Sequence, residues 1–314
     1  MGKSSEKSEV NLLLQQKQPS PWMIIAIAQN MIWIFFLPTI CRRYWFQIFG
    51  PLSFELSELV LASASIWVFT AGCICMFPIY YMELPFFEQY KIQKDRSWPW
   101  LSKSQEELDA FWKLTRRSIY YTFVNLCILV PILIFLKNKM ADFVGLSPTS
   151  YSTEEGEWPS TFEMLWQNIV MTLIHELGFY LIHKWCHTNP FLYKFHKVHH
   201  EYKMNTVLAA QHIHSIDFIL GNATPAILPV AIVQPHSFTQ FQWNIWIAWA
   251  NLDDHFGYAF PWSPVRWFPA AALTVEHDFH HSKNLGCFGS KLGIFNKLFG
   301  GHDHYQMWLS KQQH

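Results

Sequence analysis

The chain has 314 residues, of which 51% are hydrophobic and 18% aromatic, and its formal net charge is zero. Only 15% of the residues are charged, against about 25% in soluble domains, so the composition favours an integral membrane protein. The zero net charge argues against a nucleic-acid-binding face, and the six cysteines form no Cys-x-x-Cys pair, which predicts no disulfide framework.

Long apolar stretches predict an all-α fold of multi-pass transmembrane helices. Residues 1–21 are polar, contain no apolar stretch typical of a secretory signal, and are expected to form a flexible cytosolic N-terminal arm. Residues 22–314 are expected to form a single integral-membrane domain. The predicted spans are residues 22–40, 59–82, 118–136 and 161–182, followed by a helical hairpin at 218–250 that returns to the side it left. The first of these spans could instead lie in the membrane interface.

The distribution of positive charge predicts the orientation of these spans. With the N-terminus in the cytosol, the only lysines and arginines on the opposite side are Arg42, Arg43, Lys137 and Lys139. Such an excess of positive charge on one side is typical of cytosolic segments. Both termini and the histidine-rich segments described next are therefore predicted to be cytosolic.

Histidines recur in three short boxes at helical spacing. Residues three and four apart lie on one helix face, and neutral imidazole is the commonest metal ligand in proteins. Eight imidazoles in such boxes predict a site for two metal ions, with about four ligands each. The eight candidate ligands are His183, His187, His196, His199, His200, His277, His280 and His281.

The surrounding residues narrow the kind of metal chemistry. No glutamate is followed by histidine at the third position, as in soluble di-iron bundles, and His175-Glu176 lacks the second histidine of a zinc protease because residue 179 is phenylalanine. Structural zinc typically uses thiolates and closes its coordination sphere. A histidine-rich site with open positions suits iron among several metals, and beside a membrane it points to oxidation of a lipid.

The boxes resemble the eight-histidine signature of the fatty acid hydroxylase superfamily of membrane di-iron enzymes. Neighbouring segments are similar to the sterol C4-methyl oxidase branch of that superfamily. These segments are residues 87–93 (FEQYKIQ), 178–180 (GFY), 196–201 (HKVHHE), 255–262 (HFGYAFPW), 277–281 (HDFHH) and 295–300 (FNKLFG).

The resemblance implies a membrane core under a cytosolic di-metal cap, residence in the endoplasmic reticulum, and two iron ions. It further implies dioxygen as oxidant, electrons from cytochrome b5 or an NAD(P)H-dependent reductase, and hydroxylation of a membrane lipid, with a 4-methyl sterol as the expected substrate. Two alternatives stay open. One is a sterol desaturase or fatty-chain hydroxylase on the same metal site, and the other is a non-catalytic metal-binding or transport protein of the membrane.

Five further residues are candidates for supporting roles. His255 and His214 are candidates to complete the metal coordination. Glu176 is seven positions before His183 and therefore near the same helix face, where it could hold an imidazole N–H. Asp217 and Glu276, each close in sequence to a candidate ligand, are the other second-sphere candidates.

Overall fold

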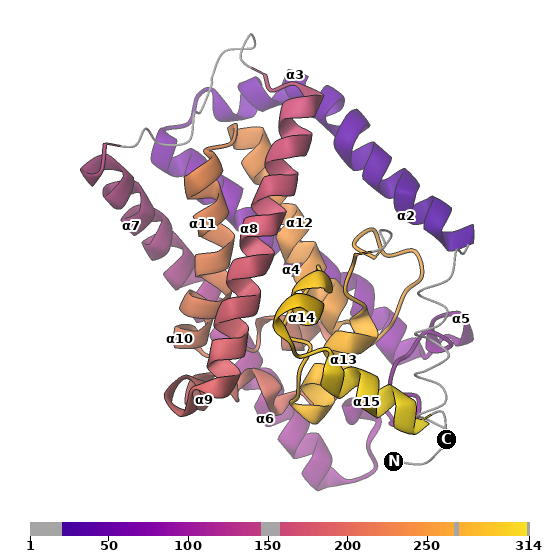
Figure 1. Ribbon diagram of the computed structural model, residues 1–314. Helices are drawn as coiled ribbons and strands as arrows, with labels where there is room; N and C mark the ends of the chain where they lie inside the picture. Colours follow the sequence, from indigo (N-terminus) through magenta and orange to yellow (C-terminus); the bar gives the residue numbers. More distant parts are fainter. Residues whose placement is uncertain (1–20, 146–157, 267–269, 313–314) are drawn as a thin grey trace.

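The computed structural model describes residues 21–145, 158–266 and 270–312, which are mostly helical (Figure 1). Almost all of the predicted arm, residues 1–20, lies outside the described residues. Within the described part, β pairing is limited to two isolated bridges, Lys91 with Tyr258 and Ala271 with Leu292. The predicted all-α class is confirmed.

The helices follow one another in chain order. The first half of the chain contains α2 (Pro21–Met31), η1 (Ile32–Phe36), α3 (Leu37–Phe49), α4 (Phe54–Met82), α5 (Pro85–Glu88), η2 (Pro99–Leu101), α6 (Gln105–Thr122), η3 (Phe123–Leu129) and α7 (Val130–Phe143). The second half contains α8 (Thr161–Thr188), α9 (Pro190–His196), η5 (His199–Glu201), η6 (Val207–Gln211), α10 (Ser215–Asp217), η7 (Phe218–Ala223), α11 (Thr224–Val233), α12 (Ser237–His255), α13 (Thr274–Lys283), α14 (Ile294–Phe299) and α15 (Asp303–Gln312).

Four continuous helical segments in the described residues are long and apolar enough to cross a membrane. They are Pro21–Phe49, Phe54–Met82, Gln105–Phe143 and Ser215–Val233. The predicted spans at 22–40, 59–82 and 118–136 fall within the first three. The predicted span at 161–182 lies in α8, which is 28 residues long but is not one of the four, since Glu163, His175 and Glu176 lower its apolar character.

Serine side chains fix where three of the long helices begin. Ser53, Ser104 and Ser160 each precede a helix, and each hydroxyl accepts a hydrogen bond from a backbone N–H of the first turn. Such caps satisfy donors that have no partner inside the helix. Because α6 starts at this cap and no glycine or proline lies between it and residue 118, residues predicted as a polar connection merge with the next span into one helix.

Three of the prolines inside the long helices follow π-helical turns. Each of η1, η3 and η7 is such a turn, and each is followed at the second residue by a proline, Pro38, Pro131 or Pro225. Proline lacks an N–H and cannot make the usual helical hydrogen bond, and a wider turn is one way in which a membrane helix adjusts to it. The spans therefore continue past their prolines.

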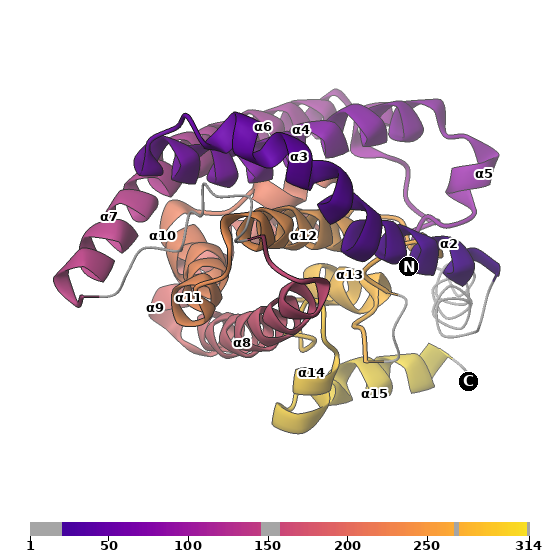
Figure 2. The ribbon, with the colours of Figure 1, turned by 90° about the horizontal axis from the view of Figure 1, so that it is seen from above.

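The long helices pack into a bundle that supports a cap of shorter elements. Helix α12 packs on α4, and α11 packs on α8; seen from above, the C-terminal α14 and α15 lie on the side away from α4 and α6 (Figure 2). Tyr80 near the end of α4 fastens the cap, because its hydroxyl donates to the carbonyl of Phe256 at 2.8 Å and accepts from the N–H of Val207 at 3.0 Å. The buried aromatic core around it includes Trp98 and Tyr258.

Candidate metal centre

The end of α8 supplies the first two predicted ligands. His183 and His187 lie one turn apart, and their ring centroids are 5.0 Å apart. The helix stops at Asn189 because Pro190 follows, and the Asn189 side chain accepts from the N–H groups of Phe191 and Leu192 at 2.9 and 3.2 Å. This tight turn lets α9 fold back beside α8.

Five histidines converge beside this turn and form a first group. The Nε2 atom of His196 lies 2.9 Å from that of His187 and 3.0 Å from that of His200. The His183 and His280 rings complete the arrangement, with centroids 4.6 Å apart. The ligand atoms of all five lie within 4.8 Å of one another, and the members are His183, His187, His196, His200 and His280.

Four further histidines form a second group beside the first. His255, at the end of α12, is central to it, with its Nε2 atom 3.1 to 3.3 Å from the Nε2 atoms of the other three. All four side chains are buried, and the members are His199, His255, His277 and His281. The structure thus brings all eight predicted box histidines and His255 into two groups, divided five and four.

Most of these rings are oriented by hydrogen bonds from Nδ1. His183, His255 and His280 donate to the carbonyls of Phe288, Asn251 and Gly286 at 2.7, 2.7 and 2.5 Å. A neutral ring that donates from Nδ1 carries its lone pair on Nε2, which is the tautomer required of a ligand that binds a metal through Nε2. Histidine ligands in metalloproteins are usually held by such a second contact.

The protonation state of the groups is set by their burial. Desolvation, reinforced by the neighbouring His196, lowers the pKa of His183 to about 3. Burial and adjacent imidazoles hold the pKa values of His199, His277 and His280 well below their usual range. These four rings are therefore neutral at physiological pH, as metal binding requires.

The donor set fits one metal ion in each group. Nitrogens about 2 Å from a common ion are about 3 Å apart when they subtend a right angle at it, which matches the observed Nε2 separations. The Nε2 atoms of His183 and His280 are buried and have no hydrogen-bond partner among the described residues. Buried nitrogens left in this way are costly, and a shared cation would satisfy them.

Asp217 supports the first group, and the other two acidic candidates lie elsewhere. Its Oδ2 accepts from the Nδ1 of His196 at 2.9 Å, and its Oδ1 lies 3.8 Å from the Sγ of Cys186. Glu176 contacts His175 at 3.1 Å rather than a box histidine. Glu276 accepts from the backbone N–H of Leu273 and thereby caps α13.

Glu176 instead holds the loop that closes the site. Its Oε2 accepts from the backbone N–H groups of Lys291 and Leu292 at 2.8 and 2.9 Å, and the ammonium of Lys291 lies 3.5 Å from Oε1. This loop begins just after Phe288, whose carbonyl orients His183. Glu176 therefore acts on the site through a loop that helical geometry alone could not reveal.

His214 lies outside both groups. Its Nδ1 accepts from the N–H of Ile216 at 3.2 Å and so caps the short α10, while its ring lies 4.9 Å from that of Phe195. Half-buried at the edge of the cap, it is the one predicted histidine that the structure does not bring to the centre.

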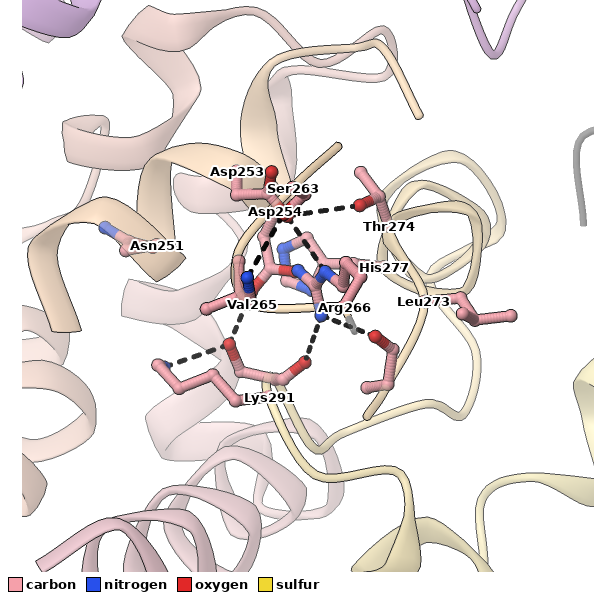
Figure 3. Close-up of polar contacts among 12 residues, drawn as sticks. Asn251, Asp253, Asp254, Ser263, Val265, Arg266, Leu273, Thr274, His277 and Lys291 are labelled. Atoms are coloured by element: carbon pink, nitrogen blue, oxygen red, sulfur yellow. Dashed lines mark hydrogen bonds and ion pairs between the residues drawn. The ribbon is translucent and has the colours of Figure 1, made fainter. Parts of the chain in front are cut away.

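A buried ionic network behind the second group was missed by sequence reasoning. Arg266 donates to Asp253 at 2.8 Å and also pairs with Asp254, the residue before His255 (Figure 3). The hydroxyl of Ser290 donates to Asp254, and the ammonium of Lys291 donates to Ser290 at 3.1 Å. The run Asp253-Asp254-His255 was the available signal, because two adjacent acids next to a ligand need a buried cation if they are not exposed.

A cavity between the long helices adjoins the histidines. Its lining comes from α4, α7, α8, α11 and α12 and is mostly apolar. Four of its residues, Phe179, Asn222, Asn251 and Ser290, also line a smaller pocket that includes His183, His199 and His255. The cavity between the long helices therefore adjoins the pocket that holds the histidines.

Comparison with known proteins finds a family model that covers these histidines. Residues 168–301 match the fatty acid hydroxylase family model. The chain is 27% identical over 254 residues to methylsterol monooxygenase erg25B of Aspergillus fumigatus, covering 79% of this chain and 76% of that protein. It is 26% identical to C-4 methylsterol oxidase erg25 of Schizosaccharomyces pombe, covering 84% and 80%. It is 28% identical to very-long-chain aldehyde decarbonylase GL1-8 of Oryza sativa subsp. japonica, covering 71% and 77%. No solved structure matches the chain.

Proposed function

We propose that the chain is a membrane di-iron monooxygenase that hydroxylates a lipid, with a 4-methyl sterol as substrate. The match of residues 168–301 to the fatty acid hydroxylase family model, which the histidine boxes resemble, supports this proposal. The observation that carries the proposal is the convergence of nine histidines into two groups beside a mostly apolar cavity. The names of two relatives, a methylsterol monooxygenase and a C-4 methylsterol oxidase, support the choice of substrate.

The chain's own residues supply position and exclusion of water. The five-histidine and four-histidine groups would each hold one iron ion, and bound iron would supply activation of dioxygen. Backbone carbonyls and Asp217 keep the imidazoles in the binding tautomer. The apolar lining around Phe179 would place the reacting carbon next to the histidines and keep water away from it.

The overall reaction requires an external reductant. One oxygen atom enters the C–H bond, the other leaves as water, and an electron donor supplies two electrons together with two protons from solvent. We propose cytochrome b5 or an NAD(P)H-dependent reductase as that donor, meeting the enzyme on the cytosolic face of the endoplasmic reticulum. The asymmetry of lysine and arginine supports this orientation, with the metal groups and both termini in the cytosol.

We also propose that residues 22–314 act as a single domain. The N-terminal helix contacts the site-bearing helix, because Gln242 on α12 donates to the carbonyl of Trp33 at 3.0 Å. Asn30 donates to the carbonyl of Pro264, between the ligand His255 and Arg266, at 3.0 Å. These contacts join the first span to the cap.

A second candidate is oxidation of a long-chain lipid on the same metal site. The relative from rice, an aldehyde decarbonylase named for very long chains, is as similar to this chain as the sterol relatives are. The mostly apolar lining of the cavity would also suit a flexible chain. Oxidation of a fatty chain and not of a sterol would favour this candidate.

Complementation tests the sterol assignment. Cells that lack their own sterol C4-methyl oxidase should grow without added sterol when they express this chain. They should not grow when they express the His280→Ala variant at the same level, because His280 belongs to the first group. Failure of the unaltered chain, with normal expression and metal content, would contradict the sterol assignment.

A further inference from the structure

Polar side chains line the cavity beside the metal centre at two separate places. Asn251 and Ser290 lie at the histidine end, and Glu58, Lys137 and Gln240 supply a polar cluster elsewhere in its lining. Gln240 is near the start of α12 and His255 is its last residue. At 1.5 Å per residue the two positions are about 22 Å apart along the helix, so the polar cluster is at the end remote from the histidines.

The polar cluster is built from buried, interacting groups. The ammonium of Lys137 lies 2.5 Å from Oε2 of Glu58, and the amide nitrogen of Gln240 donates to Oε1 of Glu58 at 3.3 Å. The Glu58 side chain is 1% exposed and that of Lys137 is 17% exposed. Charged groups this buried are costly unless they are paired and hydrogen-bonded, as both are here.

One acceptor atom in this cluster lacks a hydrogen-bond donor among the described residues. A carboxylate only accepts hydrogen bonds, so the contact with Glu58 fixes which end of the Gln240 amide is nitrogen. The Oε1 atom of Gln240 is then an acceptor; it is buried and has no hydrogen-bond partner in the described part of the chain. A ligand that donates a hydrogen bond would satisfy it.

We propose that the substrate carries a hydroxyl group at the end remote from the carbon that is oxidised, and that Gln240 and Lys137 bind this hydroxyl. The inference rests on the proposed function, since it assumes that oxidation occurs at the histidine end. A hydroxyl can donate to Oε1 of Gln240 and accept from Lys137. A carboxylate has no proton to donate to Oε1 of Gln240, and an ammonium has no lone pair to accept from Lys137.

Two kinds of lipid offer this chemistry, and the position of oxidation separates them. A 4-methyl sterol with a hydroxyl at the end of its side chain would be oxidised at the 4-methyl group. A sterol bound the other way round, with its ring hydroxyl at Gln240, would be oxidised on the side chain. In either case the new oxygen and the bound hydroxyl are at opposite ends of the molecule.

The first test measures binding without turnover. Full-length metal-loaded protein in detergent, kept free of dioxygen and reductant, is titrated with two 4-methyl steroids that lack the ring hydroxyl of a sterol. The first carries a hydroxyl at the end of its side chain, and the second has hydrogen there. The hydroxylated steroid should bind on the order of ten-fold more tightly or better, as expected for a hydrogen bond shared with a charged group. Equal binding would overturn the inference.

Substitution of Gln240, compared with a matched control variant, tests whether this residue binds the hydroxyl. Gln240→Leu should bring the ratio of the two dissociation constants close to one, and the milder Gln240→Asn should reduce it if the leucine variant does not fold. Gln242→Leu is the control, because Gln242 is on the same helix but lines a different cavity and should keep the full ratio. A full ratio in both Gln240 variants would also overturn the inference.

Analysis of the reaction product distinguishes failure of this inference from failure of the proposed function. With dioxygen and reductant present, the new oxygen should be found at the end of the sterol opposite the bound hydroxyl. Oxidation of the carbon next to that hydroxyl would overturn the inference and leave the proposed function intact. Hydroxyl-dependent binding without any oxidation would instead contradict the proposed function while supporting the binding site.

Discussion

His255 and His281 present lone pairs to each other. Their Nε2 atoms lie 3.2 Å apart, while their Nδ1 atoms donate to the carbonyls of Asn251 and Tyr202 at 2.7 and 3.3 Å. Burial lowers the pKa of both rings, so no proton is available to lie between the two nitrogens. Two lone pairs at this distance repel each other unless they share a cation, which is why the histidine groups are interpreted as metal sites.

The two additional candidate histidines should differ in their effect on metal binding. His255→Ala removes a member of the four-histidine group, so it should lower the metal content by about one ion per chain. His214→Ala removes only a helix cap and should retain the full content. Elemental analysis of purified protein measures both. Loss of metal from the His214 variant together with full retention in the His255 variant would contradict the assignment.

Replacing Asp217 by asparagine should weaken metal binding at the five-histidine group. The charged acceptor holds the Nδ1 proton of His196, and loss of such a contact typically lowers metal affinity by about 10- to 100-fold. Equilibrium dialysis against a metal buffer gives the affinity. Asp109→Asn is the control, since Asp109 lies on α6 and contacts Gln105. Equal affinities in both variants would argue against this role.

Replacing Arg266 by methionine should destabilise the cap. Arg266 is paired with Asp253 and Asp254 in a buried network, and leaving buried carboxylates without their cation costs about 3–5 kcal/mol. Thermal unfolding in detergent should therefore occur well below the temperature of the unaltered protein. Arg116→Met, on the exposed face of α6, should change it little. Similar unfolding of both variants would contradict the structural role of the network.

The metal-free protein should lose stability as the pH falls below about 7. Burial lowers the pKa of His183 to about 3 in the folded chain, whereas an unfolded histidine titrates near 6.5. Between these values the unfolded chain binds more protons, so stability decreases with decreasing pH. At pH 5 His183 alone accounts for on the order of 2 kcal/mol. Chelator-treated protein should unfold at a lower temperature at pH 5 than at pH 7, and His183→Asn should reduce that difference. A pH-independent unfolding temperature would refute this prediction.

The helical class and the apolar helices could be predicted from sequence because they depend on local patterns. The division of the histidines between the two groups could not. His199 and His200 are adjacent in the chain but join different groups, as do His280 and His281. Neighbouring residues on a helix point about 100° apart, so a box that looks like one unit in the sequence contributes to both sites.

The remaining differences between the predicted and the observed contacts of the site residues come from tertiary structure. Glu176 lies near the helix face predicted for it, but a loop from residues 291 and 292 takes up its carboxylate. Arg266 meets Asp254 only because the chain between them folds back. Neither partner can be inferred from periodicity, since each comes from a separate segment of the cap.

Transfer of labelled dioxygen into a sterol tests the central claim most directly. Iron-loaded protein in lipid vesicles, supplied with NAD(P)H, cytochrome b5 and its reductase, is incubated with a 4-methyl sterol under labelled dioxygen, and the product is analysed by mass spectrometry. We predict a sterol carrying label on the oxidised carbon, and no such product from the His280→Ala variant. A sterol recovered unlabelled from protein with full iron content and active reductase would contradict the account.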